Sequence, residues 1–481
     1  MLQNKSTTIV SEVKDFFTSS EKAIQTILTI LSSLTLSEKQ FGFESKNNNE
    51  YKNINKLFLL LMFPLFEVKD AWHYSKSSLF PVFSCGKDVF YRLLNESSIN
   101  WRKIAYKLSM QMIGKTANKS DECVDKQPRC LIVDDSDLPK TGRRIELIGK
   151  VFSHVTGKSI LAFKGLFLGY HDGKSFFALD FSLHGEQGKN QKKPYGLTSK
   201  QLKDRYSKHR DKNSAAFERK EDYFSSKIQR MMEMIKTAIG KGLRFDYVLV
   251  DSWFTCTALV KFIKTRRIGC HLLGMAKMGK TRYLFNDKKL TAKEIVDYQR
   301  RTKKVKRSKQ LSCYYSEAQV DFNGTEVKLF FSKSSRKGRW YLLLTTDLGL
   351  NFEQAYKIYS IRWSIEVFFK ESKQYLGLGK SQSQDFDAQI AATTLTMLQY
   401  NLLAVAKRFT DYETLGELFR NTRAETIQLT VAEHIWQIIV EILADLAEFL
   451  EIDTELLMEK VLTDNEKITK LVNYKTLLQA G

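Results

Sequence analysis

The sequence has few of the residues and runs that mark secreted, disordered or membrane proteins. Its six cysteines include no Cys-x-x-Cys pair, which argues against a disulfide framework and a zinc knuckle. There are only five prolines, which argues against a disordered chain. The longest apolar run, residues 57–66, contains Pro64 and is far shorter than the roughly 20 residues that cross a bilayer. The N-terminus lacks a secretory signal, so we expect a cytoplasmic protein with no membrane partner.

Acidic residues are too few to balance the basic ones. The 481 residues include 76 Lys and Arg but 54 Asp and Glu, a formal net charge of +22. An excess of this size predicts a polyanionic partner, with nucleic acid ahead of an anionic membrane. Because 43% of the residues are hydrophobic and 12% aromatic, the chain is a folded globular protein that carries this charge on defined surfaces.

The charge is unevenly distributed along the chain. Residues 186–230 contain 13 Lys or Arg against 6 acids, and residues 277–309 contain 13 against 3. Aromatic residues interleave the first segment, which favours contact with DNA over a merely solvated connection. Residues 411–464 reverse the balance, with 13 acids against 3 bases. This acidic segment is either a solvated helical face or a tail that docks on the basic surface.

Periodicity predicts helices at both ends of the chain and strands between them. Helices are expected over residues 7–36, 57–66, 223–239 and 352–375, and in most of the remainder to the C-terminus. Strands are expected over residues 130–133, 162–170, 175–183, 247–250, 268–275, 327–331 and 340–345. The sequence Asp172-Gly173 between two of them is a strong hairpin signal. The order of these elements indicates an α/β fold.

Polar residues form a stripe on the helix expected near residue 366. The stripe lies within about 80° of arc if the helix is continuous, and its members are Tyr359, Arg362, Glu366, Lys370 and Lys373. A surface helix with ordinary ion pairs at i,i+4 spacing would show the same pattern.

Two strands are followed by carboxylates. The strand at 130–133 leads into Asp134 and Asp135, and the strand at 247–250 leads into Asp251. Sites in open α/β sheets lie at the carboxyl ends of strands, so these groups could converge with Glu366. Converging carboxylates need a cation, and their oxygens favour Mg²⁺ or Mn²⁺. Adjacent strand residues face opposite ways, so only one of Asp134 and Asp135 enters such a site directly.

The segment YSIRWSIEVFFKESK, residues 359–373, resembles a known signature. Its pattern of Tyr, two residues, Arg, three residues, Glu, six residues and Lys is similar to that around the catalytic glutamate of bacterial DDE transposases in the group named after insertion sequence four. LIVDDSDLPKTGRR and YVLVDSWF resemble the first- and second-aspartate segments of that group. The resemblance spans roughly residues 129–378.

The resemblance implies an RNase H-like catalytic core, a mixed sheet flanked by helices, with a mostly β insertion before the glutamate helix. The expected organisation has five parts. These are a helical DNA-binding domain at 1–125, the first part of the core at 126–276, the basic insertion at 277–350, the glutamate helix at 351–400, and a helical region that is a candidate for dimerisation at 401–481.

The resemblance also implies roles for individual residues. Asp135, chosen over Asp134 from the family pattern, would bind two divalent metal ions together with Asp251 and Glu366. Phosphates at the transposon end would be held by Tyr359, Arg362 and Lys373. Trp363 is expected either to stack on an unpaired base or to pack at the edge of the sheet, and Trp253 is expected in the core.

The implied function is that of a DNA transposase. It would bind the terminal inverted repeats of its insertion sequence, cleave the ends and join 3′-hydroxyls to target DNA by two-metal-ion phosphoryl transfer, as a homodimer. Two alternatives remain open at this point. One is another RNase H-like nuclease or resolvase, and the other is a catalytically inactive DNA-binding protein derived from a transposase.

Overall fold

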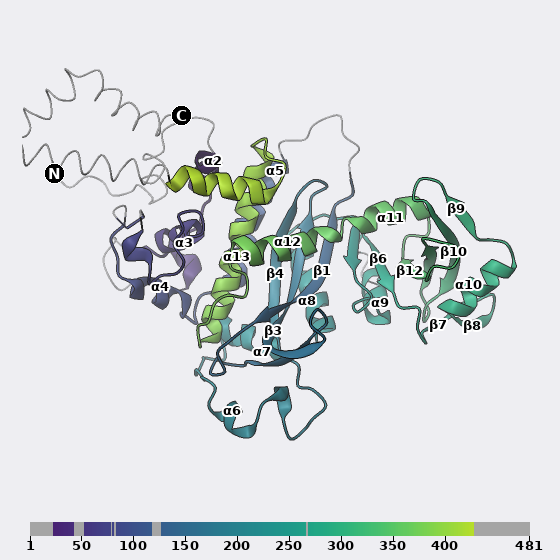
Figure 1. Ribbon diagram of the computed structural model, residues 1–481, viewed down its shortest axis with the longest axis horizontal. Coiled ribbons are helices and arrows are strands. Elements are labelled where there is room, and N and C mark those ends of the chain that lie inside the picture. The colour runs from purple at the N-terminus through teal and green to yellow at the C-terminus, as the bar shows by residue number, and fades with distance from the viewer. Residues whose placement is uncertain are drawn as a thin grey trace, which may run out of the picture. The chain divides into compact units, whose positions relative to one another are not determined.

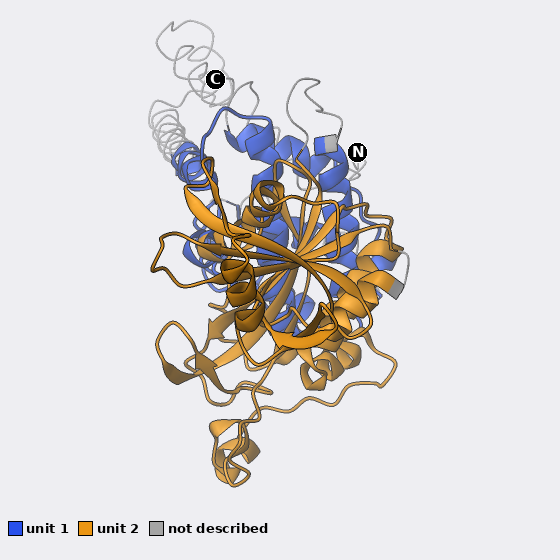
Figure 2. Ribbon diagram, turned by 90° about the vertical axis from the view of Figure 1, so that its right-hand side faces the viewer, with its two compact units in different colours: residues 1–120, 371–377, 387–481 blue, residues 121–370, 378–386 orange. Residues whose placement is uncertain are grey.

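The computed structural model describes residues 23–42, 52–77, 79–80, 83–117, 127–265 and 268–427. The chain divides into two compact units, coloured separately in Figure 2. The first comprises residues 1–120, 371–377 and 387–481, and the second comprises residues 121–370 and 378–386. Within the described ranges, no helix is long and apolar enough to cross a membrane.

The first unit is helical where it is described. Its helices are α2 (Ala23–Ser32), α3 (Asn53–Met62), α4 (Lys87–Leu94), α5 (Trp101–Ala117) and most of α13 (Phe386–Arg408). The apolar run predicted at 57–66 forms the greater part of α3, and its side chains are buried. Residues 7–22 of the first expected helix, and most of the acidic segment, lie outside the described residues.

The second unit is built on one sheet (Figure 1). Its strands are β1 (Cys130–Pro139), β2 (Gly149–Ser153), β3 (Lys158–His171), β4 (Phe176–His184), β5 (Tyr247–Val250), β6 (His271–Ala276), β7 (Arg282–Phe285), β8 (Lys288–Thr291), β9 (Lys306–Ser308), β10 (Cys313–Asp321), β11 (Glu326–Lys333) and β12 (Tyr341–Thr345). The order is β2-β3-β1-β5-β6-β12-β11-β10-β7-β8, with β4 also paired to β3 and β9 to β10.

The sheet is mixed, and helices flank it. Strands β4, β3 and β1 are antiparallel neighbours, whereas β1, β5 and β6 run parallel. The helices are α6 (Ser199–Lys203), α7 (Ala215–Phe224), α8 (Lys227–Gly240), α9 (Thr257–Thr265), α10 (Ala292–Arg301), α11 (Phe352–Ser360) and α12 (Trp363–Tyr375), the last of which continues into the first unit. The predicted α/β class with a mixed sheet is therefore confirmed, and the strand arrangement is consistent with an RNase H-like core.

The predicted hairpin is present between β3 and β4. The Asp172 carboxylate accepts hydrogen bonds from the N–H groups of Lys174 and Ser175, at 2.9 and 2.7 Å. Gly173 has φ = +103°, a backbone conformation that residues other than glycine rarely adopt. The local turn chemistry thus accounts for the hairpin that the sequence pattern indicated.

Strand β1 is longer than the sequence predicted. Its expected end before Asp134 is wrong, because β1 pairs with β3 as far as Pro139, opposite Ala162. The polar residues that suggested a loop are satisfied within the sheet, where Asp137 forms an ion pair with Lys164. Only the parallel pairing with β5 stops early, at Val133 opposite Val250. Asp134 and Asp135 therefore lie inside a strand that has an antiparallel neighbour on one side.

The helix predicted over residues 352–375 is broken into α11 and α12. The N–H groups of Ile361 and Arg362 donate to carbonyls three residues back, those of Ile358 and Tyr359, at 3.1 and 3.0 Å. Such tight turns interrupt the 3.6-residue period. Tyr359 and Arg362 therefore precede α12, but Arg362 still pairs with Glu366 at the i,i+4 spacing of the predicted stripe.

The basic segment after β6 is rich in β-structure, as expected, and it continues the sheet. Strand β12 pairs antiparallel with β6, and β11 and β10 extend the sheet from there. The segment also contains α10, which begins at a capping box formed by Thr291 and Glu294.

Candidate active site

The ends of the pairing between β1 and β5 place two aspartates next to each other. Val133 lies opposite Val250 in parallel register, so Asp134 and Asp251 are the next residues of adjacent strands. The charge of Asp251 contributes to raising the pKa of Asp134. These two carboxylates, separated by more than one hundred residues of sequence, therefore act on each other electrostatically.

Asp251 begins a tight turn that the fold holds in place. Its Oδ1 accepts hydrogen bonds from the N–H groups of Trp253 and Phe254, at 2.8 and 3.2 Å. The Thr255 hydroxyl donates to the Asp251 carbonyl at 3.0 Å. The turn crosses β6 at Gly274, where an added Cβ would lie 2.4 Å from the Thr255 Oγ1. Glycine is therefore required for this close approach.

Arg362 links the first strand to the glutamate helix. Its guanidinium donates to Oδ2 of Asp134 at 2.7 Å and to Oε1 of Glu366 at 2.6 Å. The side chains of Asp134 and Arg362 are each 15% exposed, and that of Glu366 is 38% exposed. A guanidinium with two carboxylate partners is held in one orientation. The structure thus brings together Asp134 and two residues of the predicted signature.

Tyr359, the first residue of that signature, reaches the same place from α11. Its hydroxyl donates to the carbonyl of Val250 at 3.2 Å. Burial raises the pKa of Tyr359 to about 12, while the charge of Arg362 opposes the increase. The phenol is therefore protonated at neutral pH and can donate a hydrogen bond.

Burial also raises the pKa of Asp134, to about 7. Arg362 lowers it, but the charges of Asp251 and Asp135 add to the increase. Repulsion of this kind among buried carboxylates is relieved by a bound cation. In the described structure, the Arg362 guanidinium supplies the positive charge.

Asp135 makes different contacts from its neighbour. It forms an ion pair with Lys227, the first residue of α8. Helix α8 begins there because the Ser226 hydroxyl accepts the N–H of Gln229 at 3.1 Å. Adjacent strand residues face opposite ways, and Asp134 is the one that contacts Arg362. Lys227 was not singled out from the sequence, because no motif marks it.

The two tryptophans near the site are both accessible. Trp253, expected in the core, is 46% exposed, and the Lys227 ammonium lies 4.0 Å from its ring centroid. That expectation is wrong because the turn after Asp251 carries the ring away from the sheet interior. Trp363 is 62% exposed.

Lys373, the last residue of the signature, belongs to the first unit.

The donor chemistry of the site suits a hard divalent cation. Asp134, Asp251 and Glu366 offer carboxylate oxygens, which Mg²⁺ and Mn²⁺ prefer. The arrangement is not closed around an ion, since no group of three or more His, Cys, Asp or Glu in the described ranges is placed to hold one. The guanidinium of Arg362 instead joins two of the three acids.

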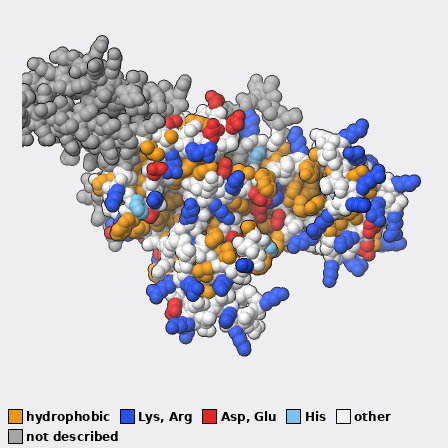
Figure 3. All heavy atoms as spheres, viewed as in Figure 1, with side chains coloured by type: hydrophobic (Ala, Val, Ile, Leu, Met, Phe, Trp, Pro, Cys, Tyr) orange, Lys and Arg blue, Asp and Glu red, His pale blue; other side chains and the backbone are white. Residues whose placement is uncertain are grey.

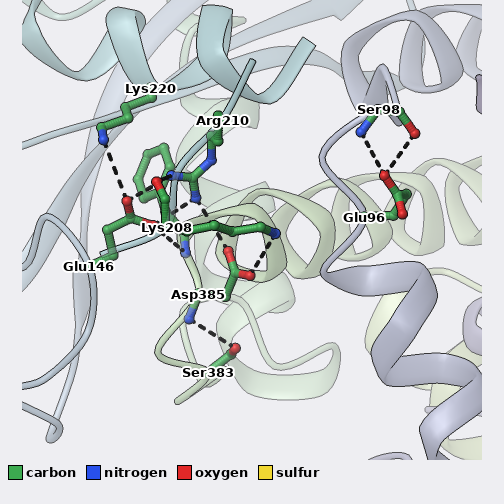
Figure 4. Close-up of polar contacts among 9 residues, drawn as sticks. Glu96, Ser98, Glu146, Lys208, Arg210, Lys220, Ser383 and Asp385 are labelled. Carbon is green, nitrogen blue, oxygen red and sulfur yellow. Dashed lines mark hydrogen bonds and ion pairs between the residues drawn. The ribbon is translucent and has the colours of Figure 1, made fainter. Parts of the chain in front are cut away.

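A buried ion network supports the loop that follows α12 (Figure 4). Arg210 donates to both carboxylate oxygens of Glu146 at 2.7 Å, and its NH2 lies 3.4 Å from Asp385. Lys208 contacts the other oxygen of Asp385 at 2.9 Å. Nearby, the Lys140 ammonium donates to the carbonyls of residues 379 and 381 at 2.8 and 2.7 Å. These contacts attach residues 378–386 to the connections between β1 and β2 and between α6 and α7.

Two sequence-family models match the chain. Residues 82–277 match the family described as DDE superfamily endonuclease, and residues 225–402 match the one described as Transposase DDE domain. No curated protein matches the chain. Neither family match singles out the insertion-sequence-four group.

One solved structure with a low overall similarity is the cryo-EM structure of the piggyBac transposase synaptic complex with hairpin DNA. It shares 14% identity and a TM-score of 0.41, over 87% of this chain and 80% of that chain. A TM-score this low carries no argument about this protein. Each of the two family matches covers less than half of the chain, so they report a similarity of residues 82–277 and 225–402 to those families.

Proposed function

We propose that this protein is a DNA transposase, which cleaves the ends of its own mobile element and joins the 3′ ends to target DNA. The observation that carries the proposal is that Arg362 pairs with both Asp134 and Glu366, while the charge of Asp251 acts on Asp134 and Tyr359 contacts the end of β5, all inside the two matched regions. Carboxylates beside phosphate-binding cations are the groups that phosphoryl transfer needs.

Asp134 is the first catalytic carboxylate in this proposal, in place of Asp135. Asp134 shares Arg362 with Glu366 and interacts with Asp251, whereas Asp135 is paired with Lys227. Asp134, Asp251 and Glu366 would hold two Mg²⁺ or Mn²⁺ ions. When bound, these ions supply activation of water and of the 3′-hydroxyl as nucleophiles.

The residues around the carboxylates bind the substrate. Tyr359 and Arg362 donate hydrogen bonds to phosphate oxygens at the transposon end, and Lys373 adds a positive charge further along α12. Trp363 is exposed and stacks on an unpaired base near the cut. The roles of Tyr359, Arg362 and Lys373 rest on the signature resemblance, and that of Trp363 rests also on its exposure.

The basic strands β9, β10 and β11 form part of the DNA-binding surface. Arg307 and Lys333 are the register partners of Tyr314 on either side, and they lie 5.9 and 6.0 Å from its ring centroid. Lys333 also lies 4.7 Å from the ring of Trp340. Figure 3 shows Lys and Arg gathered over this lobe and over the α6 region. Cations interleaved with aromatic rings suit phosphates and unpaired bases.

The expected partners follow from the same proposal. The terminal inverted repeats are recognised by the helical N-terminal part, residues 1–125, and two copies of the chain hold the two ends in a synaptic complex. Residues 401–481 serve in dimerisation.

The test is Mg²⁺-dependent cleavage of the DNA that flanks the gene, by the wild type and Glu366→Ala side by side, with binding followed in the same samples. We expect cleavage by the wild type alone and binding by both. Binding without cleavage by either protein would favour an inactive DNA-binding protein. Full activity of Glu366→Ala would refute the proposed site.

A further inference from the structure

A basic cavity of 810 Å³ lies beside the turn that carries Asp251. Its walls come from this turn, from the connection between β6 and β7, and from β7, β8 and β10. The polar and basic residues that matter here are Ser252, Thr255, Lys277, Lys280, Arg282 and Lys289. The basic charge of this segment is visible in the sequence, but no motif there marks a site.

The positive charge of the cavity is not neutralised locally. Asp321 is the one acidic residue in the described lining, and its Oδ1 accepts the N–H of Gly324 at 2.8 Å. Lys277, Lys280 and Lys289 are exposed, and none forms an ion pair with a residue in the described part of the chain. Several cations around one concave surface, next to hydroxyl groups, predict an anionic ligand with more than one charge.

The size of the cavity selects among nucleic acids. Its volume falls within the roughly 300–1,000 Å³ typical of small-ligand pockets, which admits one or two unpaired nucleotides but no duplex. Tyr283 and Phe322 also line it, with ring centroids 5.1 Å apart, but their side chains are buried and their rings are not open to a base. Binding in a cavity of this size therefore rests on its exposed cations, which suit the phosphates of a single strand.

We propose that this cavity binds an unpaired segment of a DNA strand through its phosphates, beside the second catalytic carboxylate. Ser252 lines the cavity and directly follows Asp251, so a strand held there runs toward the carboxylates. The link to catalysis rests on the proposed function, whereas binding of the strand does not.

The experiment uses the full chain in EDTA, so that no cleavage occurs, with a labelled oligothymidylate and a labelled duplex as probes. The test variant is Lys280→Gln/Lys289→Gln. The matched control is Lys288→Gln/Lys293→Gln, which removes the same charge from exposed residues outside the lining. Lys288 and Lys289 are neighbours on β8 and face opposite ways.

We expect the test variant to bind the oligothymidylate about tenfold more weakly at low salt. Its slope of log affinity against log salt should fall by about 1.4, since each single-strand phosphate contact contributes about 0.7. The control should match the wild type, and duplex binding should change less. Equal losses in both variants, or no loss in either, would overturn the proposal.

A second readout does not depend on affinity. Cys256 lines the cavity and is partly exposed. Saturating oligothymidylate should slow maleimide modification of Cys256 in the wild type more than in Lys280→Gln/Lys289→Gln, and equal slowing in both proteins, or none in the wild type, would contradict the assignment. Failure of the transposase proposal would appear separately, as absence of Mg²⁺-dependent cleavage with strand binding retained.

Discussion

Replacing Glu146 by Gln should destabilise the second unit, because it removes the main partner of a buried cation. The side chain of Arg210 is 1% exposed and that of Glu146 is 3% exposed. Two hydrogen bonds of 2.7 Å join them. Removing one member of a buried ion pair costs about 3–5 kcal/mol, since the remaining charge is left uncompensated.

The expected cost lies at the lower end of that range. Asp385 stays 3.4 Å from Arg210, and the Gln side chain can still accept one hydrogen bond. We therefore expect a loss of about 3 kcal/mol in the free energy of unfolding. For a unit of this size, at about 2–4 °C per kcal/mol, the melting temperature should fall by roughly 6–12 °C.

The effect should also depend on pH in a defined direction. Burial raises the pKa of Glu146, but the hydrogen bond and charge of Arg210 more than offset it, so the net pKa is lowered below the usual 4.5. A lowered carboxyl pKa stabilises the fold above about pH 4.5, and this stabilisation is lost as the pH falls through the lowered pKa. The difference in the free energy of unfolding between the wild type and Glu146→Gln should therefore become smaller as the pH falls below about 4.5.

The assay is urea denaturation at pH 7 and below pH 4, followed by fluorescence. Glu326→Gln, at an exposed position on β11, is the control and should change stability by less than about 0.5 kcal/mol. A loss below about 1 kcal/mol for Glu146→Gln at pH 7 would show that the network contributes little.

Three further predictions concern the surroundings of the site. Burial lowers the pKa of Lys140 to about 7, so the unfolded chain binds more protons between pH 7 and 10.5. Stability measured by urea denaturation should therefore rise from pH 7 to 9, and Lys140→Met should remove this rise; an unchanged slope would contradict it. Arg362→Gln should lower the salt slope of duplex binding by about 0.9 if Arg362 holds a phosphate, and an equal slope would leave it a structural ion pair. Gly274→Ala should cost about 1–3 kcal/mol in thermal denaturation, because its Cβ would meet Thr255; a neutral effect would show that the turn can shift.

Features with local causes could be predicted from the sequence. The β3–β4 hairpin follows from Asp172-Gly173, and β5 has the bounds that its short apolar run indicated. The signature around Glu366 identified residues that the structure brings together with a strand aspartate. These signals lie within a few residues of one another, so no long-range pairing is needed to interpret them.

Features with non-local causes could not be predicted from the sequence. The choice between Asp134 and Asp135 depends on which face α12 covers, and the contacts of Arg362 and Lys227 carry that information. The length of β1 depends on the long partner strand β3. The cavity forms only because β7, β8 and β10 extend the same sheet past β6, a pairing that the charge pattern of the segment does not encode.

The most direct test of the account compares Asp134→Asn and Asp135→Asn in Mg²⁺-dependent cleavage of the flanking DNA. The two variants remove the same charge from adjacent residues of one strand, so they differ only in the face that is altered. We predict that Asp134→Asn abolishes cleavage while retaining DNA binding, and that Asp135→Asn still cleaves. Cleavage by Asp134→Asn with none by Asp135→Asn would contradict the proposed site.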